Sequence, residues 1–149
     1  MRLEVEKMAA FYASPLGRMA AERIAARIGT LWPDADGLHV LGFGYAGPLL
    51  APFRGGARRV LSAMPETQGA QPWPEDAANG SVHVEDERLP FPDAMFDRII
   101  VAHGLEEADS PQRLMRELWR VAAPEARILV IVANRRGMWA LRESTPMGH

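Results

Sequence analysis

The chain has 149 residues, of which 48% are hydrophobic and 24% are charged, as in ordinary globular domains, so a disordered or coiled-coil chain is excluded. A net charge of −2 gives no excess of cations to displace phosphate counterions, and nucleic-acid binding is not expected. The absence of cysteine excludes disulfides and thiolate metal ligands and suits a reducing cytoplasm. The longest apolar run, residues 128–133, is too short for a membrane span. We expect one cytoplasmic domain over residues 1–149.

The first predicted element is a helix over residues 14–31. Ser14 is a good helix cap, Pro15 suits the first turn, and Pro33 lies just beyond the end. Its charged side chains are expected to face solvent. The apolar stripe expected to face the core consists of Leu16, Met19, Ala20, Ile24, Ile28 and Leu31.

The rest of the chain alternates between short apolar runs and helical segments. A short helix is expected over residues 49–53, a loop over 64–80, and a second amphipathic helix behind the Ser110 cap and Pro111. Buried strands connected by helices favour parallel pairing. The sequence therefore predicts an α/β fold with a doubly wound, mostly parallel sheet and helices on both faces. The five expected strands are residues 38–43, 58–61, 81–85, 96–102 and 127–133.

A glycine-rich turn follows the first expected strand. Residues 42–47 read Gly-Phe-Gly-Tyr-Ala-Gly, and ligands of parallel sheets bind at the carboxyl ends of the strands. A tight turn without a ligand would also use glycine. A nicotinamide dinucleotide site needs an acidic residue at the end of the second strand, and residues 61–64 contain none. This function therefore remains a third alternative that depends on the glycine spacing alone.

Longer stretches of the sequence resemble a known family. The run LPFPDAMFDRIIVAH at residues 89–103 and the run LMRELWRVAAP at 114–124 carry the similarity, with residues 40–44 and 127–130 on either side. They resemble the class I S-adenosylmethionine-dependent methyltransferases, in particular the group that includes the quinone-biosynthesis C-methyltransferases.

The resemblance implies a Rossmann-like cofactor-binding core over residues 38–133 and a tail over 134–149, with the last two strands of the family's sheet lacking. The exposed sheet edge that results suggests a homodimer. It also implies S-adenosylmethionine as cofactor and methyl transfer to an unknown acceptor, most simply a small molecule. Phe11 and Tyr12, before the first expected helix, suit either a lid on the cofactor or ordinary packing.

The resemblance assigns a place to each candidate site residue. The turn would support the methionine and ribose parts of the cofactor, the second and third strands would border the ribose and adenine, and the fourth strand would end where the sulfonium meets the acceptor. His103, at that last place, is the weak candidate for a general base. The cofactor-binding residues so implied are Gly42, Phe43, Gly44, Tyr45, Ala46, Met64, Glu85, Asp86, Leu89 and His103.

Two departures from the family pattern keep a second function open. The family usually has an acidic residue where Gly42 stands and another after the second strand, where this chain has Met64. The alternative is a non-catalytic relative that serves as an interaction or regulatory module. The enzymatic interpretation requires that Tyr45 and Met64 do not fill the hollow at the turn. The four histidines lack metal-ligand spacing, and no metal site is expected.

Overall fold

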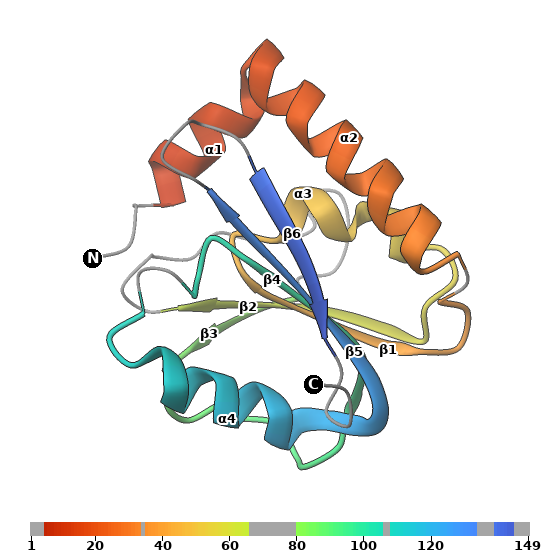
Figure 1. Ribbon diagram of the computed structural model, residues 1–149, viewed down its shortest axis with the longest axis vertical. Helices are drawn as coiled ribbons and strands as arrows, with labels where there is room; N and C mark the ends of the chain where they lie inside the picture. Colours follow the sequence, from red (N-terminus) through yellow and green to blue (C-terminus); the bar gives the residue numbers. More distant parts are fainter. Residues whose placement is uncertain (1–4, 34, 66–79, 106–107, 134–138, 145–149) are drawn as a thin grey trace.

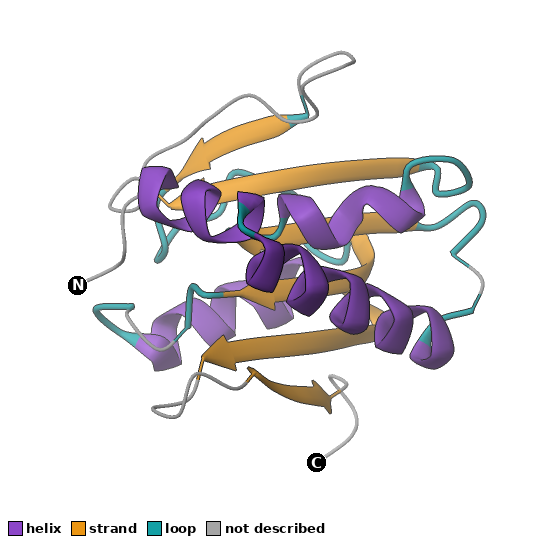
Figure 2. Cartoon of the chain, turned by 90° about the horizontal axis from the view of Figure 1, so that it is seen from above, coloured by secondary structure: helices purple, strands orange, loops and turns teal. Residues whose placement is uncertain are grey.

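The computed structural model describes residues 5–33, 35–65, 80–105, 108–133 and 139–144. The strands of this part form one sheet in the order β3-β2-β1-β4-β5-β6, seen side by side in Figure 2. The strands are β1 (His39–Gly44), β2 (Arg59–Pro65), β3 (Ser81–Val84), β4 (Phe96–Ala102), β5 (Ala122–Ala133) and β6 (Trp139–Ser144).

Every pair of neighbouring strands from β3 to β5 is parallel, and only β6 runs antiparallel, against β5. The order reverses at β1, which pairs with β2 on one side and with β4 on the other. At this reversal Gly42 lies opposite Ser62 of β2 and Ile100 of β4. The crevice beside such a reversal, at the carboxyl ends of the strands, is where open α/β sheets bind ligands.

Helices cover both faces of the sheet (Figure 1). The helices α2 (Pro15–Leu31) and α3 (Gly47–Leu50), followed by a 3₁₀ turn (Ala51–Phe53), lie on one face, and α4 (Pro111–Val121) lies on the other. The helix α1 (Val5–Ala13) packs against α2 and lies on the side to which β2 and β3 point in Figure 1.

Two apolar clusters hold these layers together, and β4 contributes to both. Ile99 and Val101 pack toward α4, while Ile100 and Ala102 pack toward α2 and α3, and all four are fully buried. Residues 99–102 are therefore continuously apolar because this part of β4 is covered on both faces. The predicted α/β fold with a mostly parallel sheet and helices on both faces is confirmed.

The predicted stripe of α2 is wrong in part. Leu16, Met19 and Leu31 are 67%, 48% and 37% exposed, whereas Ile24 and Ile28 are buried as expected. The buried face of α2 is narrower than the predicted one. Only one row of side chains, spaced four, three and four residues apart, packs against α1 and the sheet. The row consists of Gly17, Ala21, Ile24 and Ile28.

Two elements were not expected from the sequence, α1 and β6. The tail at 134–149 was expected to follow the last strand without adding to the sheet, but β6 pairs along β5 from Ala133 to Ile128. The segment Trp139–Ser144 carries no β-branched residue, so its sequence favours no strand, and the pairing is a long-range effect. β5 also begins at Ala122, five positions earlier than predicted, and β2 continues through Pro65. The expected open edge at β5 is thus covered.

No helix in the described part of the chain has the length and apolar character needed to cross a membrane.

Candidate functional site

The glycine turn at the end of β1 touches the end of β4. Gly44 has a φ of +90°, and a Cβ atom at this position would lie 2.2 Å from the carbonyl oxygen of Ala102. The next backbone N–H, from Tyr45, donates to the same oxygen at 2.9 Å. Gly44 is therefore required by both its backbone conformation and the close approach of β4. The turn and the end of β4 form one compact corner at the strand-order reversal.

Gly42 is needed for packing on the helical side of β1. A Cβ atom there would lie 2.7 Å from Leu50 Cδ1 and 2.8 Å from the Cβ of Ala46. Phe43, which alternates with it, is fully buried in the apolar cluster beneath α4. The spacing of the glycines thus serves the contact of β1 with α3 and with β4. Phe43 is a core residue, with its ring directed into the cluster and away from α3.

Tyr45 is buried at the turn by an aromatic partner from α1. Its ring stacks on that of Tyr12, with centroids 5.6 Å apart and an interplanar angle of 13°. Met8, one helical turn earlier in α1, completes this small cluster. Met64 is also buried, at the end of β2. Tyr45 and Met64, the two side chains able to fill the hollow, are therefore both buried, and Tyr45 is covered by α1.

His103 lies directly after β4, beside the turn. Its φ is +57°, its backbone N–H donates to Ile131 of β5 at 3.2 Å, and its side chain is 5% exposed. Nε2 of the ring lies 2.5 Å from the hydroxyl of Tyr12. Burial lowers the pKa of His103 to about 4, so the ring is neutral near pH 7. A pKa this low makes the ring a weak base near neutral pH, because burial disfavours its protonated form.

The remaining predicted residues lie along the ends of β2 and β3. Met64 follows Ala63, which is opposite Phe43, and Met64 itself pairs with His83. Glu85 is exposed and Asp86 is half-buried at the end of β3. The structure therefore brings Gly44, Tyr45 and His103 into direct contact or adjacency, and it places Met64, Glu85 and Asp86 along the same carboxyl edge of the sheet.

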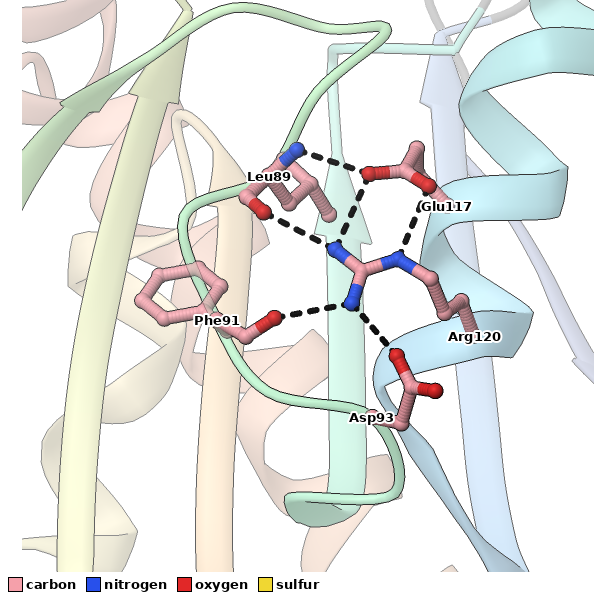
Figure 3. A network of polar contacts seen from close by, with 5 residues as sticks. All are labelled: Leu89, Phe91, Asp93, Glu117 and Arg120. Atoms are coloured by element: carbon pink, nitrogen blue, oxygen red, sulfur yellow. Dashed lines mark hydrogen bonds and ion pairs between the residues drawn. The ribbon is translucent and has the colours of Figure 1, made fainter.

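Leu89 is buried in the cluster beneath α4 and is held there by its backbone. Its N–H donates to Glu117 at 2.8 Å, and its carbonyl accepts from Arg120 at 2.9 Å (Figure 3). The Arg120 guanidinium also donates to the Phe91 carbonyl and to the Asp93 carboxylate. We call this set of five residues, Leu89, Phe91, Asp93, Glu117 and Arg120, the arginine clamp.

The arginine clamp contains one cation, Arg120, between two carboxylates, Glu117 and Asp93. Hydrogen bonding to Arg120 lowers the pKa of Glu117, and the bonds to Glu117 and Asp93 raise the pKa of Arg120. The clamp ties the turn before β4 to α4 and fixes where Leu89 lies. Glu117 and Arg120 lie in the stretches that resemble the family, but no local pattern predicts their role, since their contact partners lie about thirty positions away in the chain.

An open groove of about 460 Å³ runs along the side of α4 away from the arginine clamp. Its lining is mostly apolar, with Arg116 as the charged member. It begins at Leu105, just after His103. The groove is lined by Leu105, Pro111, Gln112, Met115, Arg116 and Trp119.

The comparisons with known proteins agree on one family. A family model described as "Methyltransferase domain" matches residues 41–130, which include the glycine turn, His103 and the arginine clamp. Among curated relatives, the ubiquinone/menaquinone biosynthesis C-methyltransferase of Bordetella avium is 43% identical over 49 residues. That stretch covers 33% of this chain and 19% of the relative, so the match spans about a fifth of the relative's length.

Solved structures share the fold at low sequence identity. An S-adenosylmethionine-dependent methyltransferase from Thermotoga maritima matches with a TM-score of 0.62 and 16% identity, over 88% of this chain and 59% of that one. The [4+2]-cyclase SpnF matches with a TM-score of 0.61 and 21% identity, over 80% of this chain and 48% of that one. Proteins named for different reactions thus have this fold, which does not by itself define the reaction.

Proposed function

The chain belongs to the methyltransferase domain family, and on this premise we propose that it binds S-adenosylmethionine and transfers a methyl group to a small-molecule acceptor. One observation carries the proposal. The family match over residues 41–130 includes the corner where the turn after β1 touches the end of β4, at the reversal of the strand order. Open α/β sheets bind their ligands at this corner.

We propose the following places for the ligand-binding residues. The turn from Gly42 to Ala46 supports the methionine and ribose parts of the cofactor. Met64 lies beside the ribose and adenine, and Leu89 lines the adenine ring. Glu85 and Asp86 lie nearest the adenine amino group. His103 is next to the reacting methyl group.

The residues at the corner suit a cationic ligand. When bound, S-adenosylmethionine supplies a methyl group activated by a positively charged sulfonium. Because burial keeps His103 neutral, this residue adds no positive charge to repel the ligand. What the chain contributes is mainly orientation and the exclusion of water from the corner.

Isothermal titration calorimetry tests the proposal. Saturable binding of S-adenosylmethionine and S-adenosylhomocysteine, without binding of NADH, is the expected result. Binding of NADH alone would favour the nicotinamide alternative, which the glycine spacing alone suggests. The control variant Gly37→Ala should bind both compounds as the wild type does. Gly37 lies before β1, at the opposite edge of the sheet from the corner, with open space around it.

A second candidate function is a non-catalytic interaction module. The apolar groove on α4 favours it, because apolar grooves of this kind receive partner side chains or helices. No carboxylate stands at Gly42 or at Met64, so the acids that usually hold the cofactor are missing at both places. If the chain binds none of the three compounds (S-adenosylmethionine, S-adenosylhomocysteine and NADH), the result favours the interaction module over the enzyme.

The arrangement of the whole chain is also a proposal. We propose a single domain over residues 1–149 that functions in the cytoplasm, without nucleic acid as a partner. A homodimer through a sheet edge would now involve β3 or β6, the outer strands of the described sheet. Sedimentation velocity tests this, because a dimer sediments as a species of twice the 16.5 kDa mass of the chain.

A further inference from the structure

Tyr12 and His103 form a buried hydrogen bond between the first helix and the end of β4. The two residues are 91 positions apart, and the Tyr12 hydroxyl lies 2.5 Å from Nε2 of His103. Both residues are nearly inaccessible, at 7% and 5% exposed. A polar pair hidden from solvent at a proposed ligand corner needs a reason, since two apolar side chains would pack there without the risk of an unmatched partner.

The tyrosine is held in place from three directions. Its ring stacks on Tyr45 and meets Phe11 edge-on, with an interplanar angle of 79°. The corner between α1 and α2 fixes the helix that carries it, because Ser14 accepts from the Gly17 N–H and donates to the Phe11 carbonyl. A Cβ atom on Gly17 would lie 1.9 Å from the same carbonyl oxygen, so the corner closes only over glycine.

A neutral His103 allows the hydrogen bond to run in either direction, and we assign the donor role to the Tyr12 hydroxyl. A neutral imidazole has one protonated nitrogen and one that accepts. The tyrosine hydroxyl is the natural donor to an accepting Nε2, which leaves the ring proton of His103 on Nδ1. The backbone of His103 is fixed separately, through Ile131. The Tyr12 hydroxyl therefore sets both the orientation and the tautomer of a ring whose main chain is already held.

We propose that Tyr12 is a positioning residue of the candidate site: its hydroxyl fixes the ring of His103 at the end of β4 and at the same time holds α1 closed over the glycine turn. The inference rests on the proposed function only for the identity of the ligand. The hydrogen bond from Tyr12 to His103 makes α1 one wall of the candidate site. A preorganised wall favours binding because less order has to be created when the ligand arrives.

The test compares Tyr12→Phe with the wild type in the absence of ligand. Phenylalanine keeps the ring and its stacking but removes the hydroxyl. In ¹⁵N spectra at pH 7, the wild type shows one His103 tautomer with the proton on Nδ1, and Y12F shows a mixture of both. Hydrogen exchange of the α1 amides rises about 3- to 10-fold in Y12F, the loss expected for one net hydrogen bond. Lys7→Gln, an exposed change on the same helix, leaves both readouts unchanged.

A second pair of variants separates positioning from general damage. His103→Leu removes the ring nitrogen that bonds to Tyr12, so Tyr12→Phe added to H103L should speed exchange in α1 much less than it does in the wild type. Equal effects in both backgrounds, or an unchanged His103 tautomer in folded Y12F, would overturn the proposal.

Titration with S-adenosylhomocysteine supplies the link to the ligand. We expect Y12F to bind it about 3- to 10-fold more weakly, and tighter binding by Y12F would show that Tyr12 obstructs the site, which contradicts the inference. If S-adenosylhomocysteine binds to no variant, the proposed function fails, whereas the tautomer and the exchange rates still decide the role of Tyr12.

Discussion

Gly44 is the residue whose conformation the corner constrains most. Its positive φ and its contact with the Ala102 carbonyl are separate demands, and Gly37 shares only the first, with a φ of +77° and open space around it. We expect Gly37→Ala to cost about 1 kcal/mol of unfolding free energy and Gly44→Ala about 3 kcal/mol or more. Chemical denaturation of the two variants measures the difference. An equal loss of unfolding free energy in both variants would mean that the backbone near Ala102 shifts to accept the added methyl group without a penalty.

His103 connects stability with pH at the same corner. Its pKa is about 4 in the folded chain and about 6.5 as a free group, so the unfolded chain binds the extra proton first as the pH falls. The contribution of the neutral His103 ring to the free energy of unfolding is therefore fully present above pH 6.5. It is lost as the pH falls from 6.5 to 4. The shift corresponds to at most about 3 kcal/mol.

Urea unfolding at a series of pH values between 7 and 4 measures this loss. H103Q, which has no titrating ring, should show a flatter dependence in the same window. A dependence as steep in H103Q as in the wild type would assign the effect to other groups.

At the scale of elements, the arginine clamp joins α4 to the turn before β4. Arg120 reaches two backbone carbonyls and two carboxylates, and its side chain is about one third exposed (32%), so solvent weakens these bonds only in part. We expect Arg120→Ala to lower the unfolding free energy by about 2 kcal/mol, because the carbonyls of Leu89 and Phe91 lose their donor.

Arg113→Ala is the matched control, on the same helix. Arg113 pairs with Glu87, but the two side chains are 65% and 46% exposed, and such pairs contribute less than about 0.5 kcal/mol. Thermal or urea unfolding of both variants separates the two kinds of contact. A loss in R113A equal to that in R120A would show that the carbonyl contacts add nothing.

Elements with a local signal could be predicted, and those that depend on distant contacts could not. Residues 99–102 are apolar throughout and lie in β4; Ser14 and Pro15 likewise mark the beginning of α2. In contrast, the partner of Trp139–Ser144 is the preceding strand, so its own composition gives no indication of β6.

The same limit holds for the candidate site. The glycine turn and the end of β4 were predicted because strand ends in a parallel sheet converge. The bond from Tyr12 to His103 joins residues 91 positions apart, and no periodicity in either segment encodes it. Sequence reasoning left Phe11 and Tyr12 open between lid and packing, and the stacking of Tyr12 on Tyr45 shows the packing directly.

For the whole molecule, the direction of β6 has a practical consequence. β6 begins opposite Ala133, level with the carboxyl edge that holds His103, and ends opposite Ile128, toward the other edge. The strand thus carries the chain away from the candidate site, whereas α1 lies across it. A biotin or affinity handle attached at Ser144, the end of β6, would anchor the protein to a sensor chip with the corner facing bulk solution. The same handle attached at Glu6, in the first turn of α1, would lie beside the binding face.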